Sequence, residues 1–280
     1  MEPLTPARCS INTATLGYKA PIATVIDQIA RHGFGAISPW RREVEGGDVR
    51  TISRHIRDAG LAVSGYCRSS YMPAVSHDER LRIHEENLGA LRDAGELRAA
   101  CFVIVAGGLA LGSRDIASAR QQVLDGLAAL LPEARDLGVA LAIEPLHPMY
   151  AADRSCVNTI AQALAMCDQL DPSNQGGVGI AIDAYHTWWD PTLHQSIAHA
   201  GAARRISAFH ICDWLNPTRD MLMDRGMMGD GVIDLRSMRE SIERAGYRSF
   251  AEIEIFSDHW GSEDSARTLN ICRARLQTAL

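Results

Sequence analysis

Four apolar segments of the chain each present one residue that can bind a metal ion. Glu144 and Asp183 each close a short run of small and branched apolar residues, and His210 and Glu254 lie in two later runs of the same kind. Three carboxylates and one imidazole suit Mn²⁺, Mg²⁺, Co²⁺ or Zn²⁺, and the absence of a cysteine ligand leans away from a structural zinc. A divalent ion with open coordination positions can chelate a hydroxy-ketone and polarise its carbonyl group.

Taken singly, these residues have simpler explanations. A glutamate at a strand end often caps a helix or joins a surface ion pair, and a lone histidine on a strand is more often a core residue. One such residue on each of four consecutive strands is better explained by a metal site. Glu252 shares the strand parity of Glu254 but lies one layer deeper, where an unpaired charge is costly. Glu254 is therefore the better ligand. Glu252 either contacts a ligand from below, or the register assigned to strand 250–256 is wrong.

Strands and amphipathic helices alternate along the whole chain, as a parallel α/β fold requires. The expected strands cover 9–13, 35–40, 61–66, 101–105, 139–144, 179–183, 206–210 and 250–256. The expected helices cover 22–32, 48–59, 76–97, 116–137, 156–170, 191–199, 233–245 and 265–280. Eight βα units predict a (β/α)8 TIM barrel, with residues 1–280 forming a single domain. The four candidate ligands then fall on neighbouring strands, and their ends converge.

Local signals agree with this fold. Gly60, Gly138 and Gly246 each stand just past an expected helix and just before an expected strand. In strand 139–144 the large apolar side chains alternate with Ala140, Ala142 and Glu144. Strand 179–183 alternates in the same way and ends in Asp183. Because side chains alternate along a strand, the large ones should face the helices and the small ones the barrel interior, with the acid at the mouth.

Composition excludes several other classes of protein. The net charge is −6 and no basic run is present, which argues against a sequence-independent grip on nucleic acid. The seven cysteines contain no CxxC pair, so we expect reduced thiols and a cytoplasmic protein. The N-terminus lacks the features of a signal peptide, and no apolar run is long enough to cross a membrane. Lys19 is the sole lysine and lies in an early loop, which argues against Schiff-base catalysis.

Five segments carry a resemblance to a known family. They are EPLHPMYAADRS at 144–155, DAYHTWWDP at 183–191, FHICDWLNPTRD at 209–220, DRGMMGDGVIDL at 224–235 and EIEIFSDHWG at 252–261. With them the chain resembles the sugar phosphate isomerases and epimerases that have a xylose-isomerase-like barrel. The resemblance covers nearly the whole chain. The family includes ketose epimerases, hydroxypyruvate isomerase, inosose isomerase and dehydratase, and an endonuclease branch.

The resemblance implies roles for the four candidate ligands. The family's metal quartet carries onto Glu144, Asp183, His210 and Glu254. In the ketose epimerases the two ligand glutamates also transfer the proton, one on each face of an enediolate, which makes Glu144 and Glu254 the expected catalytic residues. We expect an isomerase or epimerase of carbohydrate metabolism, dependent on a divalent metal ion, with Mn²⁺ as the first candidate. Its substrate would be a small keto-sugar or polyol-derived ketone.

The same resemblance suggests substrate-binding residues. His186, three residues after Asp183, matches a histidine of the family that would contact a substrate hydroxyl. Arg219 is the candidate for an arginine that binds substrate in relatives, although its spacing of nine residues from His210 is longer than in some ketose epimerases. Those epimerases have a second acid six residues after the first ligand, where this chain has Tyr150. That departure weakens a simple ketose 3-epimerase assignment.

Further residues of the expected barrel mouth have two readings each. His147 could face the substrate or be a solvent-exposed loop residue. Trp40 and Arg68 follow the second and third strands, and Arg68 could bind a carboxylate or phosphate or form an ordinary surface ion pair. The segment 212–231 has no periodicity and holds four of the nine methionines. With Trp214 it could form a lid over the metal or the interface of a homo-oligomer.

Three other functions remain open. A lyase, either a dehydratase or a decarboxylase acting on a related keto-sugar or oxo-acid, would use the same enolate and lose water or CO₂. A phosphodiesterase acting on damaged DNA would need further histidine and aspartate ligands and a basic groove. A non-catalytic sugar-binding barrel would not need the pair of acids.

Overall fold

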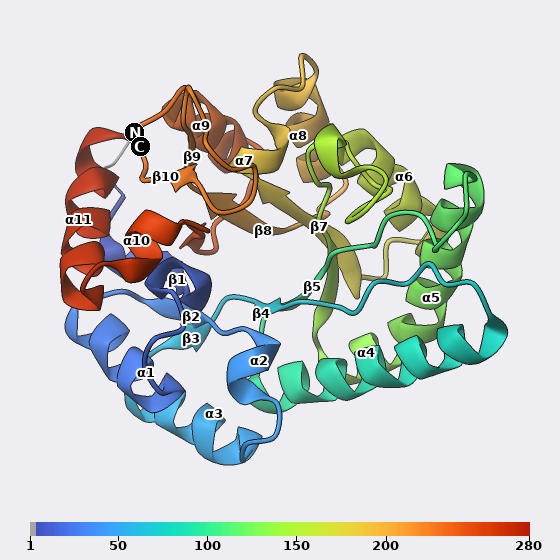
Figure 1. The fold of residues 1–280 in the computed structure, drawn as a ribbon, viewed down its shortest axis with the longest axis horizontal. Coiled ribbons are helices and arrows are strands. Elements are labelled where there is room, and N and C mark those ends of the chain that lie inside the picture. Colours follow the sequence, from blue (N-terminus) through green and yellow to red (C-terminus); the bar gives the residue numbers. More distant parts are fainter. Residues whose placement is uncertain (1–3) are drawn as a thin grey trace.

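Within residues 4–280, which the computed structural model describes, nine strands form one parallel sheet in the order β3-β2-β1-β11-β8-β7-β6-β5-β4. The strands are β1 (Cys9–Asn12), β2 (Ala36–Ser38), β3 (Ala62–Val63), β4 (Tyr66–Cys67), β5 (Cys101–Ile104), β6 (Ala140–Ile143), β7 (Val178–Asp183), β8 (Ile206–Ile211) and β11 (Ala251–Ile253). The helices surround them (Figure 1). The expected (β/α)8 TIM barrel is confirmed.

The third barrel position is divided between two strands. The sequence predicts one strand over 61–66, but β3 pairs with β2 whereas β4 pairs with β5. Ser64 and Gly65 separate the two. A single parallel bridge between Trp40 and Cys67 joins the two sides of the barrel here. Cys67 thereby stands at the barrel mouth, next to Arg68.

The longer helices begin and end where the sequence predicts, within a few residues. They are α1 (Ile22–Arg31), α3 (Val49–Asp58), α4 (His77–Leu97), α5 (Ile116–Leu137), α6 (Ile160–Leu170), α8 (Leu193–Ala202), α9 (Leu235–Arg244) and α11 (Ser265–Thr278). Helix α6 starts four residues later than predicted, because the Thr159 side chain accepts a hydrogen bond from the backbone of Gln162 and caps the helix there. Gly138 closes α5 at a φ of 69°, a conformation that favours glycine. No described helix is both long and apolar enough for a membrane span.

Several short elements were not predicted. These are the 3-10 turns η1 (Pro6–Arg8), η2 (Thr13–Leu16) and η3 (Pro148–Tyr150), and the helices α2 (Arg41–Val44), α7 (Ala184–Thr187) and α10 (Asp258–Ser262). The segment 212–231, expected to lack regular structure, contains the antiparallel pair β9 (Asp213–Trp214) and β10 (Arg225–Gly226). Because helices and strands this short have little or no periodicity, their formation depends on tertiary contacts.

Two separate apolar clusters reflect the alternation along the strands. Leu141, Ile143 and their counterparts on the other strands pack with the helices in the large outer core. A small inner cluster contains Ala142, Ala181 and Ala208, as the parity argument predicts. The register sets Asp183 and Glu252 on either side of His210. Small inner side chains therefore end in a layer of polar ones at the barrel mouth.

Candidate metal and active site

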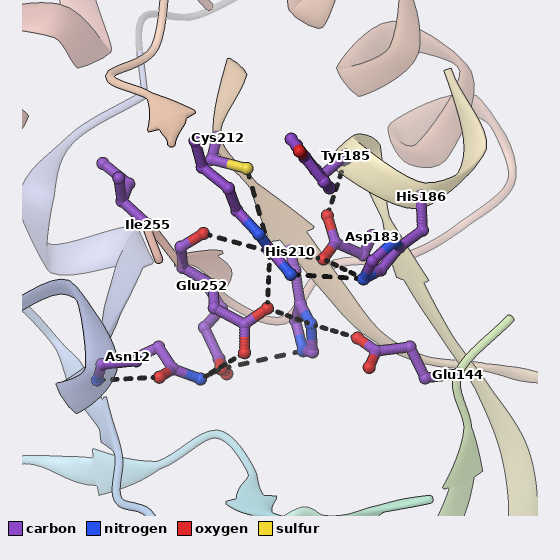
Figure 2. A network of polar contacts seen from close by, with 12 residues as sticks. Asn12, Glu144, Asp183, Tyr185, His186, His210, Cys212, Glu252 and Ile255 are labelled. Atoms are coloured by element: carbon purple, nitrogen blue, oxygen red, sulfur yellow. Dashed lines mark hydrogen bonds and ion pairs between the residues drawn. The ribbon is translucent and has the colours of Figure 1, made fainter. Parts of the chain in front are cut away.

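Four side chains of metal-binding type converge at the C-terminal ends of neighbouring strands. Glu144, Asp183, His210 and Glu254 are all buried, and each offers one ligand atom within 4.8 Å of the others. Glu144 and Glu254 directly follow β6 and β11, whereas Asp183 ends β7 and His210 lies within β8. Figure 2 shows Glu144, Asp183 and His210 pointing toward one another. In a TIM barrel this end of the strands is the face that carries active sites.

The imidazole of His210 lies among carboxylates on both sides. Nδ1 is 2.9 Å from Oε1 of Glu144 and 3.8 Å from Oε2 of Glu254. Nε2 has no hydrogen-bond partner and lies 3.7 Å from Oε1 of Glu252. Burial disfavours the charged ring, but the three carboxylates outweigh it and raise the pKa of His210 well above its ordinary value. The surrounding carboxylates therefore favour the protonated ring.

Arg225 is the buried cation of the same site. Its Nη1 donates to Oδ2 of Asp183 at 2.9 Å and to Oε2 of Glu254 at 3.0 Å. The guanidinium carbon lies 4.5 Å from the ring centre of Tyr185 and 4.9 Å from that of Phe256. Burial opposes its charge, but Asp183 and the other anions outweigh burial and raise the pKa of Arg225 well above its ordinary value. This arginine offsets part of the negative charge that the carboxylates concentrate in the barrel.

The two carboxylates that Arg225 contacts have altered protonation equilibria. Burial raises the pKa of Asp183 to about 6, although the charge of Arg225 acts in the opposite direction. Burial likewise raises the pKa of Glu254, while His210 and Arg225 lower it. Carboxyl groups whose pKa is raised toward neutral pH bind a proton more readily, which suits acid–base chemistry.

The donor set fits a divalent metal ion. Three carboxylates and one imidazole nitrogen match Mn²⁺, Mg²⁺, Co²⁺ or Zn²⁺, and the other ring nitrogen of His210 faces a carboxylate, as is usual for a metal-bound histidine. A second group, made of Cys67, Glu252 and Glu254, is a poorer candidate. Burial raises the pKa of Cys67 well above its ordinary value, so a metal ion there would have to displace the thiol proton.

Beneath the four ligands, Glu252 is held by Asn12 of β1 and by Ser64 of the link between β3 and β4. Its Oε1 accepts a hydrogen bond from Asn12 at 2.8 Å and its Oε2 accepts one from Ser64 at 2.7 Å. Nδ2 of Asn12 also donates to Oε1 of Glu254 at 2.9 Å, and Oδ1 of Asn12 accepts from the indole of Trp40 at 2.7 Å. The buried charge of Glu252 is thus paired and hydrogen-bonded, and the strand register is as the sequence predicts.

A pocket opens above these residues. Five of the residues selected from the sequence line it: Trp40, Arg68, Glu144, His186 and Glu254. His186 is 3% exposed, and its Nε2 is 3.2 Å from Nη2 of Arg225. Burial and the charge of Arg225 lower the pKa of His186 well below its ordinary value. These shifts favour the neutral ring, and its Nε2 faces Arg225 at the pocket wall.

Asp183 and His210 lie outside the lining of this pocket, and so do two of the residues expected to bind substrate, His147 and Arg219. His147 is half-buried between Trp189 and Trp214, with ring centres 5.6 Å and 5.2 Å away. Its backbone N–H donates to Nδ1 of His186 at 3.3 Å, so it orients that ring. The side chain of Arg219 is 74% exposed and pairs with Asp224. Arg219 points outward, and Arg225 takes the place at the pocket that the sequence assigned to it.

Sequence reasoning missed the two further arginines of the pocket, Arg154 and Arg225. They lie in the segments 144–155 and 224–235, which carry the family resemblance, and this was the one signal available. Tyr150, which stands where some relatives have an acid, also lines the pocket. Its hydroxyl donates to the carbonyl oxygen of Met221 at 2.6 Å and so ties the segment 212–231 to the barrel mouth.

The methionines of that segment do not form a uniform lid. Met227 and Met228 are fully buried in the outer core, whereas Met221 is 48% exposed. Trp214 stacks on Tyr185 with a distance of 4.7 Å between ring centres. Leu222, from the same segment, lines the pocket. The segment thus contributes Leu222 to the pocket wall and is anchored by two buried methionines.

Comparisons with known proteins agree with this architecture. A family model described as xylose isomerase-like TIM barrel matches residues 26–274. A crystal structure of a protein from Sinorhizobium meliloti 1021 superposes with a TM-score of 0.93 at 49% sequence identity, covering 97% of this chain and 98% of that one. No curated protein matches the sequence.

Two more distant structures share the fold. The IOLI protein with a bound zinc atom superposes with a TM-score of 0.81 at 17% identity, covering 96% of each chain. D-psicose 3-epimerase in the presence of D-fructose superposes with a TM-score of 0.75 at 18% identity, again covering 96% of each chain. At such identities the similarity establishes the fold and nothing finer.

Proposed function

Because the chain belongs to the xylose isomerase-like TIM barrel family, we propose that it is a divalent-metal-dependent isomerase or epimerase. Its substrate would be a small keto-sugar or a polyol-derived ketone, converted through an enediolate. One observation carries the proposal: Glu144, Asp183, His210 and Glu254 bring their ligand atoms within 4.8 Å of one another beside a pocket. Sugar epimerases among the structural relatives support the same reaction class.

The four residues would hold the metal through their carboxylate oxygens and the Nδ1 atom of His210. When bound, the ion would polarise the substrate carbonyl and lower the energy of the enediolate. Mn²⁺ is the first ion to test, with Mg²⁺, Co²⁺ and Zn²⁺ as alternatives. Glu252 and Asn12 would keep His210 and Glu254 in place through the contacts described above.

Glu144 and Glu254 would move the proton. Both line the pocket and follow β6 and β11, and β7 and β8 lie between these strands in the sheet. Two carboxylates on separated walls can address opposite faces of a planar enediolate. One would take the proton from carbon, and the other would return a proton to the second face in an epimerisation. Burial raises the pKa of Glu254, so its carboxylate is a stronger base than that of an ordinary glutamate.

Arg225 and His186 would orient the substrate. Arg225 presents a fixed positive charge at the pocket wall and can stabilise negative charge on the reacting oxygens. His186 is neutral and can bond to a hydroxyl group. His147 would act through His186, whereas a role for Arg219 would require its side chain to leave Asp224. Trp40 and Arg68 would contact the part of the substrate farther from the metal.

Solvent exchange tests this function. The Mn²⁺-loaded protein would be incubated in D₂O with ketoses, tetruloses, inososes and oxo-acids, and the products followed by mass spectrometry. Deuterium on carbon in an unchanged or isomerised skeleton would support the proposal. Loss of water or CO₂ would instead assign the lyase alternative. Exchange that is equally fast after removal of the metal, or in an Asp183→Asn variant, would contradict the site as described.

A further inference from the structure

Two arginines stand where the pocket beside the metal ligands meets a second, outer pocket. The residues that line both are Trp40, Arg68, Arg154, Leu222 and Phe256. Glu144, His186, Arg225 and Glu254 line the inner pocket alone. We call Arg68 and Arg154 the rim arginines.

Neither rim arginine forms an ion pair with any residue in the described range 4–280. Nη1 of Arg68 donates to the backbone oxygen of Ser69 at 2.9 Å, and its guanidinium lies 4.4 Å from the ring centre of Tyr71. The guanidinium of Arg154 lies 5.3 Å from the ring centre of Tyr150, and its buried Nε has no hydrogen-bond partner. Buried donors are normally paired, so the two side chains have hydrogen-bonding capacity left for a ligand.

Four of the five charged side chains that line the outer pocket are positive. Lys19 and Arg42 line it together with the rim arginines, and Asp258 is the one carboxylate among its lining residues. Burial lowers the pKa of Arg68, and the positive charge of Arg154 lowers it further. Like charges held at a partly buried rim raise the local potential and attract an anion.

The positions of the two pockets decide which part of a substrate would meet the rim. Glu144 and Glu254 line the inner pocket and not the outer one, whereas the rim arginines line both. A keto-sugar whose carbonyl lies at the metal ligands and whose chain extends toward the outer pocket therefore passes Arg68 and Arg154 with the end remote from the carbonyl.

We propose that the substrate is an anionic keto-sugar whose carboxylate or phosphate group, at the end remote from the reacting carbonyl, is bound by Arg68 and Arg154. The planar, permanently charged guanidinium forms paired hydrogen bonds with either kind of anion. This inference rests on the proposed function, because that function places the other end of the substrate at the metal ligands. It narrows the substrate from any small keto-sugar to one that carries a negative charge.

Equilibrium binding of unreactive probes tests the inference. Calorimetry would compare glucitol, gluconate and glucitol 6-phosphate binding to the Mn²⁺-loaded protein. We expect at least one anion to bind about tenfold or more tighter than neutral glucitol, which corresponds to about 1.4 kcal/mol. Tighter gluconate would assign a carboxylate, and tighter glucitol 6-phosphate a phosphate. Equal binding of all three probes would overturn the inference.

Substitutions of the rim arginines test whether these residues cause the preference for anionic probes. Arg68→Gln and Arg154→Gln should each weaken binding of the favoured anion more than binding of glucitol, whereas Arg68→Lys and Arg154→Lys should retain part of the preference because they keep the charge. Arg92, exposed on α4 and paired with Glu133, lines neither pocket, and Arg92→Gln should bind as the parent does. A preference that survives in both glutamine variants would belong to the metal alone and would contradict the role of the rim.

A second readout separates this inference from the proposed function. Metal content and thermal melting would be measured for every variant, and both should match the parent. Solvent exchange with neutral ketoses, combined with no anion preference, would refute the rim inference and leave the proposed function standing. If the protein binds no metal but prefers anions, and this preference depends on Arg68 and Arg154, the role of the rim arginines would stand and the proposed function would be refuted.

Discussion

Nε2 of His210 lies 3.7 Å from Oε1 of Glu252, on the side of the ring away from Glu144. This is an ion-pair distance and not a hydrogen bond. It sets one ring nitrogen toward Glu252 and leaves Nδ1 facing Glu144 and Glu254. Because Asn12 and Ser64 hold Glu252, a residue outside the proposed quartet would determine which nitrogen of His210 faces the proposed metal.

Replacing Glu252 should therefore weaken metal binding. Glu252→Gln keeps the shape of the side chain but removes the charge that orients His210, and we expect affinity for Mn²⁺ to fall by about 10- to 100-fold. Competition with a chelator would measure this. The control is Glu240→Gln, because Glu240 is an exposed residue of α9 paired with Arg244. Unchanged affinity in Glu252→Gln would exclude the positioning role.

Loss of Asp183 should have a larger effect on the metal. Asp183 is fully buried, and its Oδ1 also accepts a hydrogen bond from the backbone of Tyr185 at 2.7 Å. Asp183→Asn keeps that acceptor but removes an anionic ligand, so bound metal should fall to a small fraction of the parent's. Elemental analysis after gel filtration would measure it, with Asp190→Asn, a half-buried residue outside the proposed quartet, as the control. Full metal occupancy in Asp183→Asn would refute the proposed quartet.

Removal of either acid should slow proton transfer. General acid–base groups contribute about 10²- to 10⁴-fold to rate, so Glu144→Gln and Glu254→Gln should each lose deuterium exchange on that scale. Since both residues are also proposed ligands, metal content must be measured beside the rate. A variant that keeps its metal and loses exchange would separate the two roles. Exchange at the parent's rate in either variant would remove that residue from the mechanism.

A buried ion pair outside the candidate site should contribute strongly to the free energy of unfolding. Asp171 and Arg205 are each 2% exposed, and Nη1 of Arg205 donates to Oδ2 of Asp171 at 2.7 Å. Backbone N–H groups of Gln175 and Gly176 also donate to this carboxylate. Asp171→Asn leaves Arg205 buried without its counter-charge, and the free energy of unfolding should fall by about 3–5 kcal/mol in urea denaturation at pH 7.

The pH dependence of that loss has a defined sign. Burial raises the pKa of Asp171, but the hydrogen bonds from Arg205 and the backbone outweigh it, so the folded-state pKa lies below the ordinary value. The stabilisation is thus complete above the unfolded pKa of about 4 and is lost as pH falls through the folded pKa. The gap between parent and Asp171→Asn should narrow below about pH 4. Glu133→Gln, at the exposed pair with Arg92, should change stability little at any pH. A gap that widened in acid would show that another group is responsible.

Most of the architecture could be predicted without coordinates. The alternation of small and large side chains in β6 and β7, together with glycines such as Gly138 after the helices, is a local pattern that the chain carries in any context. It was enough to place Glu144, Asp183, His210 and Glu254 at one end of a barrel, because parallel strands in neighbouring positions end at the same face. Both conclusions depend on residue type and period alone.

The arginines needed the tertiary structure. Arg154 and Arg225 lie in loops or short elements, where no period links position in the chain to the direction of the side chain. Whether Arg219 or Arg225 entered the pocket depended on long-range contacts: Arg225 is held by Asp183 and Glu254, whereas Arg219 pairs locally with Asp224. The sequence by itself determined the barrel and the residues at its strand ends. The fold decided which charges face the pocket, because the direction of a loop side chain is set by partners distant in the chain.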